Sequence, residues 1–170
     1  MDLAVIVIKP DSIRDILEKS VMSDLMQVVN LEVVFAKYHH FTQKQVELMY
    51  PKWVDRPVFK YMVKNYLIGP SLVLLVLGVD VSESINIAKG KMNVGGGIRN
   101  KYKRYSIEEM EKLSFSEEQI NIHKSENRIH STDTTTEAWD IMSQICNIRE
   151  LNEVSHYFKM ENQLTFDLIR

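Results

Sequence analysis

An unbroken run of apolar, mostly β-branched residues near the amino terminus constrains the fold of this chain more than any other feature. Residues 3–8 read LAVIVI and are followed at once by Lys9, Pro10 and Asp11. Such a run is typical of a central strand in a sheet that is covered on both faces. Proline cannot donate a ladder hydrogen bond, so the strand should end there. We expect Lys9 to project beyond the sheet, where its ammonium could meet a phosphate or be solvated.

The remaining pattern predicts an α+β fold, because strand-like segments alternate with segments of helical periodicity. The expected strands are 2–9, 31–40, 71–78 and 127–132, and the expected helices are 12–29, 43–50, 55–66, 81–90 and 134–146. This βαββαβ order corresponds to the ferredoxin-like sandwich, an antiparallel four-stranded sheet covered by helices. The pattern alone leaves other α+β layouts open.

Composition and charge narrow the class of protein. The 170 residues are 45% hydrophobic and 26% charged, which suits one core and a single domain over residues 1–170. A net charge of -2 lacks the basic field of proteins that bind nucleic acid or membrane surfaces, so we expect neither partner. Residues 72–77, the longest apolar run, are too few to cross a bilayer. Cys146 is the only cysteine, and without a signal pattern we expect a cytoplasmic protein.

Two further segments suggest phosphate chemistry. In residues 127–133 (NRIHSTD), His130 lies beside an amide and two hydroxyls. A nucleophilic histidine must be nearly neutral at pH 7, with one ring nitrogen free and the other held by a hydrogen bond, which these side chains could supply. The glycines 95–97 lead to Arg99, whose guanidinium can bind a phosphate with two hydrogen bonds. Each feature has an ordinary alternative, His130 as a packing residue and the glycines as a flexible loop.

Together and in this order, the motifs resemble those of the nucleoside diphosphate kinase family, whose members move a terminal phosphate between nucleotides through a phosphohistidine. The resemblance covers roughly residues 1–78, 95–99 and 127–145. The motifs that carry it are VIKPD at 7–11, RPVF at 56–59, IGP at 68–70 and NRIH at 127–130. The same resemblance implies the ferredoxin-like arrangement.

The resemblance also implies roles for individual residues. His130 would be the phosphorylated nucleophile, with Lys9 and Arg99 as catalytic cations. The phosphate and ribose contacts would be Lys9, Tyr50, Arg99 and Asn127, and the base contacts would be Val58 and Met62. The implied reaction is ping-pong transfer of the γ-phosphate of a nucleoside triphosphate to a nucleoside diphosphate, in a homo-oligomer. Mg²⁺ would be held mainly by the nucleotide phosphates rather than by protein ligands.

The sequence departs from the family pattern at several positions. Val58 stands where the family stacks an aromatic ring on the base, with Phe59 beside it as a candidate substitute. Asn86 occupies the position of a second phosphate-binding arginine of the family, and the position of a threonine lies near Met92. We therefore expect fewer side-chain contacts to the phosphates. The family's acidic partner of the histidine falls on Ile141.

That last departure leaves Asp140 or Glu137 as the nearby carboxylates and leaves open which group orients His130. The segment between Gly90 and Gly95 is also shorter than usual, in a region where the family forms the loop over the site and part of its subunit contact.

Residues 100–126 match neither the family nor a simple core. We expect an inserted helical pair with Ser106 and Ser116 as N-caps, because each precedes acidic residues. The pair is either a solvated excursion or a lid in which Lys103 or Arg104 replaces the cation missing at Asn86. Residues 149–170 form a C-terminal extension whose apolar spacing predicts a helix packed on the core or on another subunit.

Other functions are less consistent with the sequence. The runner-up is a divergent nucleotide-binding module with little or no transferase activity, because two phosphate contacts are missing. RNA binding on a similar sheet would need paired aromatic residues in a strand after the glycines. The chain has no GxxxxGK[ST] phosphate loop, which argues against a P-loop kinase. His39 and His40 point to opposite faces of their expected strand, so we do not expect a metal site there.

Overall fold

The computed structural model describes residues 1–91 and 95–168, and side chains up to residue 160. Its strands are β1 (Asp2–Ile8), β2 (Glu32–His39), β3 (Ser71–Gly78) and β4 (Ile129–Ser131). Its helices are α1 (Pro10–Arg14), α2 (Glu18–Val28), α3 (Gln43–Met49), the 3₁₀ turn η1 (Pro51–Trp53), α4 (Phe59–Leu67), α5 (Val81–Lys89), α6 (Ile98–Lys101), α7 (Ile107–Lys112), α8 (Glu117–Ser125), α9 (Thr135–Ile145) and α10 (Ile148–Leu168).

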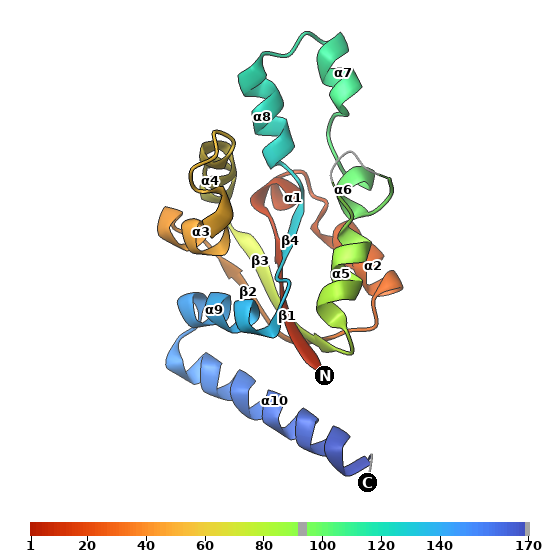
Figure 1. Ribbon diagram of the computed structural model, residues 1–170, viewed down its shortest axis with the longest axis vertical. Coiled ribbons are helices and arrows are strands. Elements are labelled where there is room, and N and C mark those ends of the chain that lie inside the picture. The colour runs from red at the N-terminus through yellow and green to blue at the C-terminus, as the bar shows by residue number, and fades with distance from the viewer. Residues whose placement is uncertain (92–94, 169–170) are drawn as a thin grey trace.

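The four strands form one antiparallel sheet in the order β2-β3-β1-β4. The expected α+β sandwich is therefore confirmed, with β1 in the centre and β4 at one edge (Figure 1).

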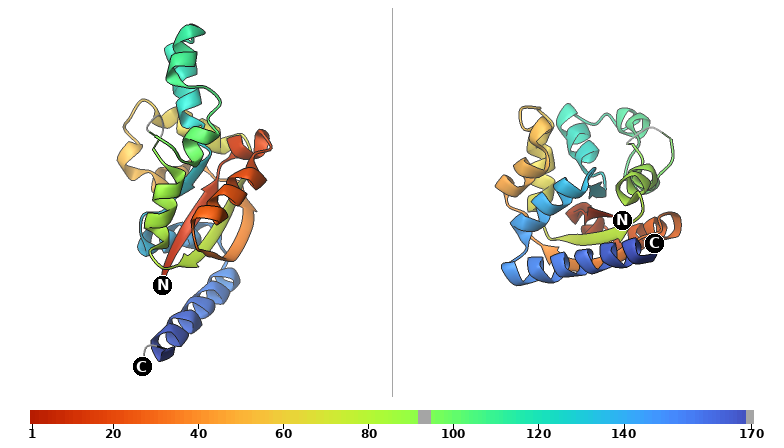
Figure 2. Two further views of the ribbon diagram at one scale, coloured as in Figure 1. Left: turned by 90° about the vertical axis from the view of Figure 1, so that its right-hand side faces the viewer. Right: turned by 60° about the horizontal axis from the view of Figure 1, so that its bottom comes forward.

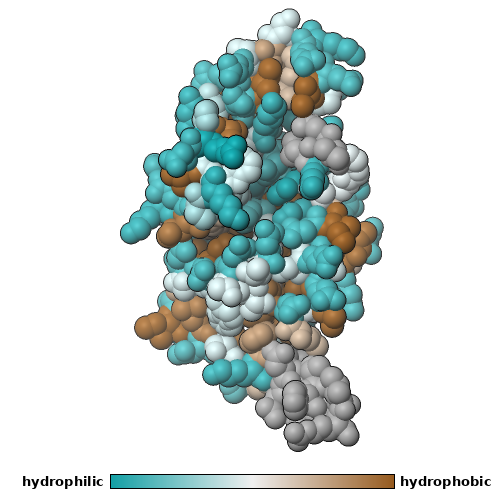
Figure 3. Space-filling view, viewed as in Figure 1, coloured by the Kyte–Doolittle hydropathy of each residue, from teal (hydrophilic) through white to brown (hydrophobic). Residues whose placement is uncertain are grey.

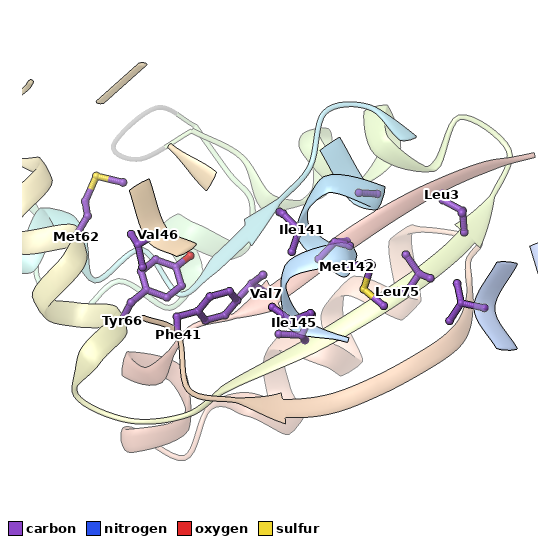
Figure 4. Close-up of a cluster of buried hydrophobic side chains, with 14 of the residues drawn as sticks. Leu3, Val7, Phe41, Val46, Met62, Tyr66, Leu75, Ile141, Met142 and Ile145 are labelled. Carbon is purple, nitrogen blue, oxygen red and sulfur yellow. The ribbon is translucent and has the colours of Figure 1, made fainter. Parts of the chain in front are cut away.

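Both faces of the sheet are covered, which explains why β1 is apolar throughout. Val5 and Val7 point to a cluster built with α3, α4 and α9, and part of this cluster is drawn in Figure 4. Ala4 and Ile6 point to a second cluster built with α2 and α5. Successive strand residues alternate between faces, so a strand buried on both sides needs apolar residues at every position.

Three boundaries differ from the sequence-based expectation. The helix expected at 12–29 breaks into α1 and α2 at Ile16, which has a φ of 58° and is 88% exposed. The helix expected from residue 55 begins only at Phe59, because Pro57 disfavours helical geometry in the residue before it. The strand expected at 127–132 is only three residues long, because Arg128 has a φ of 68° and cannot continue it.

The helical pair and the C-terminal extension lie at opposite ends of the molecule (Figures 1 and 2). Ser106 and Ser116 cap α7 and α8 through capping boxes, as the sequence predicts. The base of α8 packs on α4. At the other end, α10 packs on the core through Val154, so the first of the two expectations for the tail is confirmed for this part of it.

The surface shows where apolar groups remain exposed. On the face drawn in Figure 3, hydrophobic residues lie in separate patches among hydrophilic ones. Within the described residues, no helix combines the length and the apolar character needed to cross a membrane.

Candidate active site

A cavity of about 820 Å³ lies at the edge of the sheet beside β4. Its walls come from the α3–η1 segment, the start of α4, the end of α5, and parts of α6, α8, β4 and α9. His130 lies in this wall. Because Ile129 packs with the α2–α5 cluster, the side chain of His130 points to the opposite face of the sheet, where it is half-buried.

The short strand that carries His130 is held by the turn after β1. The backbone N–H of Lys9 donates to the carbonyl of Arg128 over 2.9 Å, and the N–H of Arg128 donates to Asp11 Oδ2 over 3.1 Å. The Arg128 guanidinium is buried and forms ion pairs with Asp11 and Asp15, at 3.4 and 2.6 Å. This network fixes the left-handed Arg128 and therefore the direction in which β4 leaves it.

The imidazole of His130 is kept neutral. Burial lowers its pKa well below 6.5, and the positive charges of Lys89, Arg99 and Lys9 lower it further. The ring of Tyr50 packs beside it, with the ring centroids 4.7 Å apart. A neutral ring has a free lone pair at pH 7, which is what a nucleophilic histidine requires.

The hydroxyls after His130 do not hold its ring, contrary to the sequence-based expectation. Ser131 Oγ accepts from Lys89 Nζ over 2.7 Å, and Thr132 Oγ1 accepts from the N–H of Val5 over 2.9 Å. Glu137 and Asp140 line the cavity, but among the described residues neither bonds to the imidazole. Tyr50 is therefore the side chain that the structure places against the ring.

Lys9 does not line the cavity itself but lies behind Asn127, which does. The side chain is fully buried, and its Nζ donates to the Ser125 carbonyl over 2.6 Å and to Asn127 Oδ1 over 3.0 Å. Asn127 itself lines the cavity. Burial lowers the pKa of Lys9 to about 8. Lys9 thus positions Asn127 and adds positive potential behind it.

Arg99 lines the cavity next to His130. Its Nη2 donates to the carbonyl of Ile129 over 3.0 Å. Within the described part of the chain its partners are backbone carbonyls, and no carboxylate lies within ion-pair distance. The backbone before Arg99 packs closely on Gly90, and this requires a glycine at position 97. Gly97 has a φ of 101°, and a Cβ there would lie 2.9 Å from the Cα of Gly90.

The apolar end of the cavity contains the residues expected to contact the base. Val58 and Met62 both line it, as does Tyr50. Phe59 is not among the described residues that line the cavity, so the expectation that it could substitute for the missing aromatic was wrong. Besides Tyr50, the aromatic side chain that lines the cavity is Trp53, which is 45% exposed and was missed from the sequence.

The chain matches the family model for nucleoside diphosphate kinase over residues 2–146. It belongs to the nucleoside diphosphate kinase family. The match covers β1 to α9 and leaves only α10 outside. The activity of the family, transfer of phosphate from a nucleoside triphosphate to a nucleoside diphosphate, is accordingly the activity of this chain.

Solved structures show the same fold. The nucleoside diphosphate kinase of Encephalitozoon cuniculi is 21% identical, with a TM-score of 0.66 over 84% of this chain and 86% of that one. The Borrelia burgdorferi enzyme, solved as a transition-state mimic with vanadate and ADP, is 22% identical, with a TM-score of 0.63 over 85% of this chain and 90% of that one. The Halobacterium salinarum enzyme, solved with CDP, is 17% identical, with a TM-score of 0.66 over 86% and 93%. Comparison with curated protein sequences gave no match.

The structure accounts for two of the family positions that are changed here. Asn86 is a structural residue, since its Nδ2 donates to Asp133 Oδ1 over 2.9 Å and its Oδ1 accepts from Ser131 Oγ over 3.3 Å. Met92 lies outside the described residues. Ile141, which stands at the position of the family's acidic residue, is 5% exposed and packs in the core beside β1.

The structure does not place a cation of the inserted helical pair where Asn86 lacks one. Lys103 and Arg104 are not among the described residues that line the cavity, whereas Lys89 and Lys91 are. The inserted pair does reach the cavity, through Asn121 and Lys124 of α8. Lys89 follows Asn86 by three residues and therefore lies on the same side of α5, which is a signal that the sequence contained.

The structure offers little for a resident metal ion. Among the side chains of residues 1–91 and 95–160, no group of three or more His, Cys, Asp or Glu is placed to hold one. Two of the histidines instead have protein side chains as neighbours. His39 Nε2 lies 3.2 Å from Gln45 Oε1, and His123 Nδ1 lies 3.0 Å from Glu126 Oε2.

Proposed function

We propose that this member of the family transfers phosphate through His130. A ring nitrogen of His130 would attack the γ-phosphorus of a nucleoside triphosphate, forming an N–P bond while the bond to the β-phosphate oxygen breaks and its electron pair leaves with the diphosphate. A second diphosphate would then take the phosphoryl group from His130 by the reverse step. The observation that carries this proposal is a neutral imidazole in a cavity wall with three cationic side chains around it.

The cations and their neighbours have distinct roles in this proposal. Arg99 would bind the transferred phosphate, because its charge faces the cavity without a carboxylate partner among the described residues. Lys9 would act with Asn127, whose amide it orients. Tyr50 would hold the imidazole in place. Such preorganised charges each contribute about 3 kcal/mol to stabilising the transition state, or roughly a hundredfold in rate.

The base and ribose would lie at the apolar end of the cavity. Val58 and Met62 provide small apolar contacts on one wall. Trp53 provides the large aromatic surface that position 58 lacks, and it stands close enough to the cavity to lie against a base.

Mg²⁺ would enter with the nucleotide. The donor set suits this, because the described residues offer no three-ligand group and Mg²⁺ keeps several waters when it is bound through phosphates. The carboxylates of Asp133, Glu137 and Asp140 line the cavity and could bind the water molecules of the ion. When bound, the ion would neutralise charge on the β- and γ-phosphates.

We further propose that the protein forms a homo-oligomer in the cytoplasm. Met26 and Val28 on α2 and Tyr38 on β2 are more than half exposed and offer an apolar surface for a second copy.

Burial raises the pKa of the Cys146 thiol to about 11, so it is an unreactive thiol suited to a reducing compartment.

Initial-rate kinetics with ATP as donor and CDP as acceptor test the transfer mechanism. A phosphoenzyme predicts parallel lines in double-reciprocal plots at several fixed CDP concentrations. His130→Ala should lower kcat by at least about a thousandfold, since it removes the nucleophile. His40→Ala changes an exposed histidine just after β2, the strand at the opposite edge of the sheet from β4; it is the matched control and should retain activity. Intersecting lines would exclude the ping-pong mechanism, and a wild type that binds ATP without transfer would be a binding module.

A further inference from the structure

Lys89 is a buried cation that the family motifs do not explain. It is the last residue of α5 and is only 9% exposed. Its Nζ lies 2.7 Å from Ser131 Oγ, the residue after His130, and its side chain lines the cavity. It is also the cation with the largest effect on the pKa of His130. Lys89 therefore stands beside the reacting group.

Within the described part of the chain, the ammonium of Lys89 is incompletely satisfied. An ammonium has three N–H donors, and one of them is used on Ser131. The nearest carboxylates have other partners, since Asp133 accepts from Asn86 and Glu137 accepts from the N–H of Asp133. Within the described residues Lys89 forms no ion pair. Burying a charge without a partner is costly, so the site favours an anion that would complete it.

A purely structural role accounts less well for these observations. Linking α5 to β4 through Ser131 needs one donor, and a neutral side chain could supply it without the cost of burying a charge. Burial and the nearby Arg99 lower the pKa of Lys89 to about 8, because both disfavour the charged form. A cation held at such a cost between Arg99 and His130 is typical of a preorganised phosphate site.

We propose that Lys89 binds the phosphate chain of the nucleotide beyond the α-phosphate, in place of the arginine that the family has at position 86. Asn86 lies three residues earlier on the same side of α5, where it bonds to Asp133 and Ser131. The cation has thus moved by about one helical turn along α5. This inference rests on the proposed function for the identity of the ligand, but it concerns binding and needs no turnover.

Equilibrium binding measured by calorimetry tests the proposal. Lys89→Met removes the charge and keeps most of the length of the side chain, and it should weaken binding of ADP or of a non-hydrolysable ATP analogue at least tenfold. Binding of AMP should change less than twofold. Lys89→Arg should recover most of the affinity. Lys103→Met removes one charge of the same kind outside the cavity and should bind ADP as the wild type does.

Each outcome separates the two proposals. Unchanged affinity of Lys89→Met for both ADP and the ATP analogue, with a melting temperature like that of the wild type, would overturn the role of Lys89. Equal weakening of AMP and ADP would also overturn it, because the effect would then not come from the outer phosphates. If Lys89→Met loses ADP affinity but the wild type forms no phosphohistidine, the role of Lys89 stands and the proposed transfer through His130 fails.

Discussion

At the scale of single residues, the proposed chemistry depends on buried or partly buried charges that have no carboxylate partner among the described residues. Lys9, Lys89 and Arg99 surround His130, and their hydrogen bonds go to carbonyl, amide or hydroxyl oxygens. Their potential disfavours a proton on His130 and favours a phosphate beside it. The same cluster therefore keeps the imidazole neutral, as the proposed nucleophilic role requires, and provides positive potential for the phosphate in that proposal.

The neutrality of His130 can be measured directly. Because burial and the nearby cations lower its pKa well below 6.5, the ring should titrate at a clearly lower pH than an ordinary histidine. An NMR titration of the histidine rings, with His130 assigned by the missing signals of His130→Ala, should show its midpoint well below 6.5. The midpoint should rise in Lys89→Met. A midpoint at 6.5 or above would contradict the electrostatic account.

The residues of the site were predictable from sequence to different degrees. Tyr50, Val58, Met62, Arg99, Asn127 and His130 all line the cavity, because the motifs that carry them recur at family spacing. Lys89 and Trp53 lie outside those motifs, so no motif indicated them. The partners of Ser131 and Thr132 depend on α5 and β1, which are distant in sequence, and local reasoning assigned those hydroxyls to His130 instead.

At the scale of elements, β4 is short and depends on its neighbours for its position. It has three residues, and Arg128 just before it ties it to the turn after β1. The periodicity of the sequence predicted where strands and helices lie but not the break at Ile16 or the late start of α4. The first boundary lies at the left-handed Ile16 and the second follows from Pro57, and both are local backbone effects rather than periodic ones.

Removing the Arg128 guanidinium should destabilise the protein strongly. Arg128→Met leaves Asp11 buried without its cation, and breaking a buried ion pair costs about 3–5 kcal/mol in the free energy of unfolding. Urea denaturation measures this quantity. Arg149→Met removes an exposed arginine paired with Glu153 on α10 and should leave the stability nearly unchanged. Equal stabilities of the two variants would show that the Arg128 network does not hold β4.

At the scale of the whole molecule, the site sits at one edge of the sheet, between segments that are far apart in the chain. The cavity joins α3, α5, α6, α8 and α9, so it forms only when the entire sandwich is folded. The order of elements predicted an α+β fold, because the central strand and its covering helices have strong patterns, and the family resemblance was needed to favour the ferredoxin-like sandwich over other layouts. The sequence left open whether the inserted pair is a solvated excursion or a lid, and the lid alternative assigned the contact to Lys103 or Arg104 rather than to α8.

Folding of the site should make stability depend on pH in a defined direction. Lys9 and Lys89 have folded pKa values of about 8 against 10.5 for a free lysine, so between these values the unfolded chain binds more protons than the folded one. The free energy of unfolding should therefore rise as pH increases from 8 to 10, by at most about 3 kcal/mol for each lysine. The same increase should disappear as pH falls back to 8.

Denaturation at pH 8, 9 and 10 measures this rise, and Lys89→Met should show about half of it. Above pH 10 the raised pKa values of Tyr50 and Tyr66 act in the opposite direction, so the window ends there. Stability that falls from pH 8 to pH 10 in the wild type would mean that the two lysines are not buried as the structure describes.

The most direct test of the account is to locate the phosphate on the enzyme. The protein is incubated with Mg²⁺ and ATP labelled in its γ-phosphate, and the labelled residue is identified by mass spectrometry under alkaline conditions. We expect one acid-labile, base-stable phosphate on His130, which disappears when CDP is added and is absent in His130→Ala. Transfer from ATP to CDP that continues without a label on His130, or with the label on another residue, would contradict the central claim.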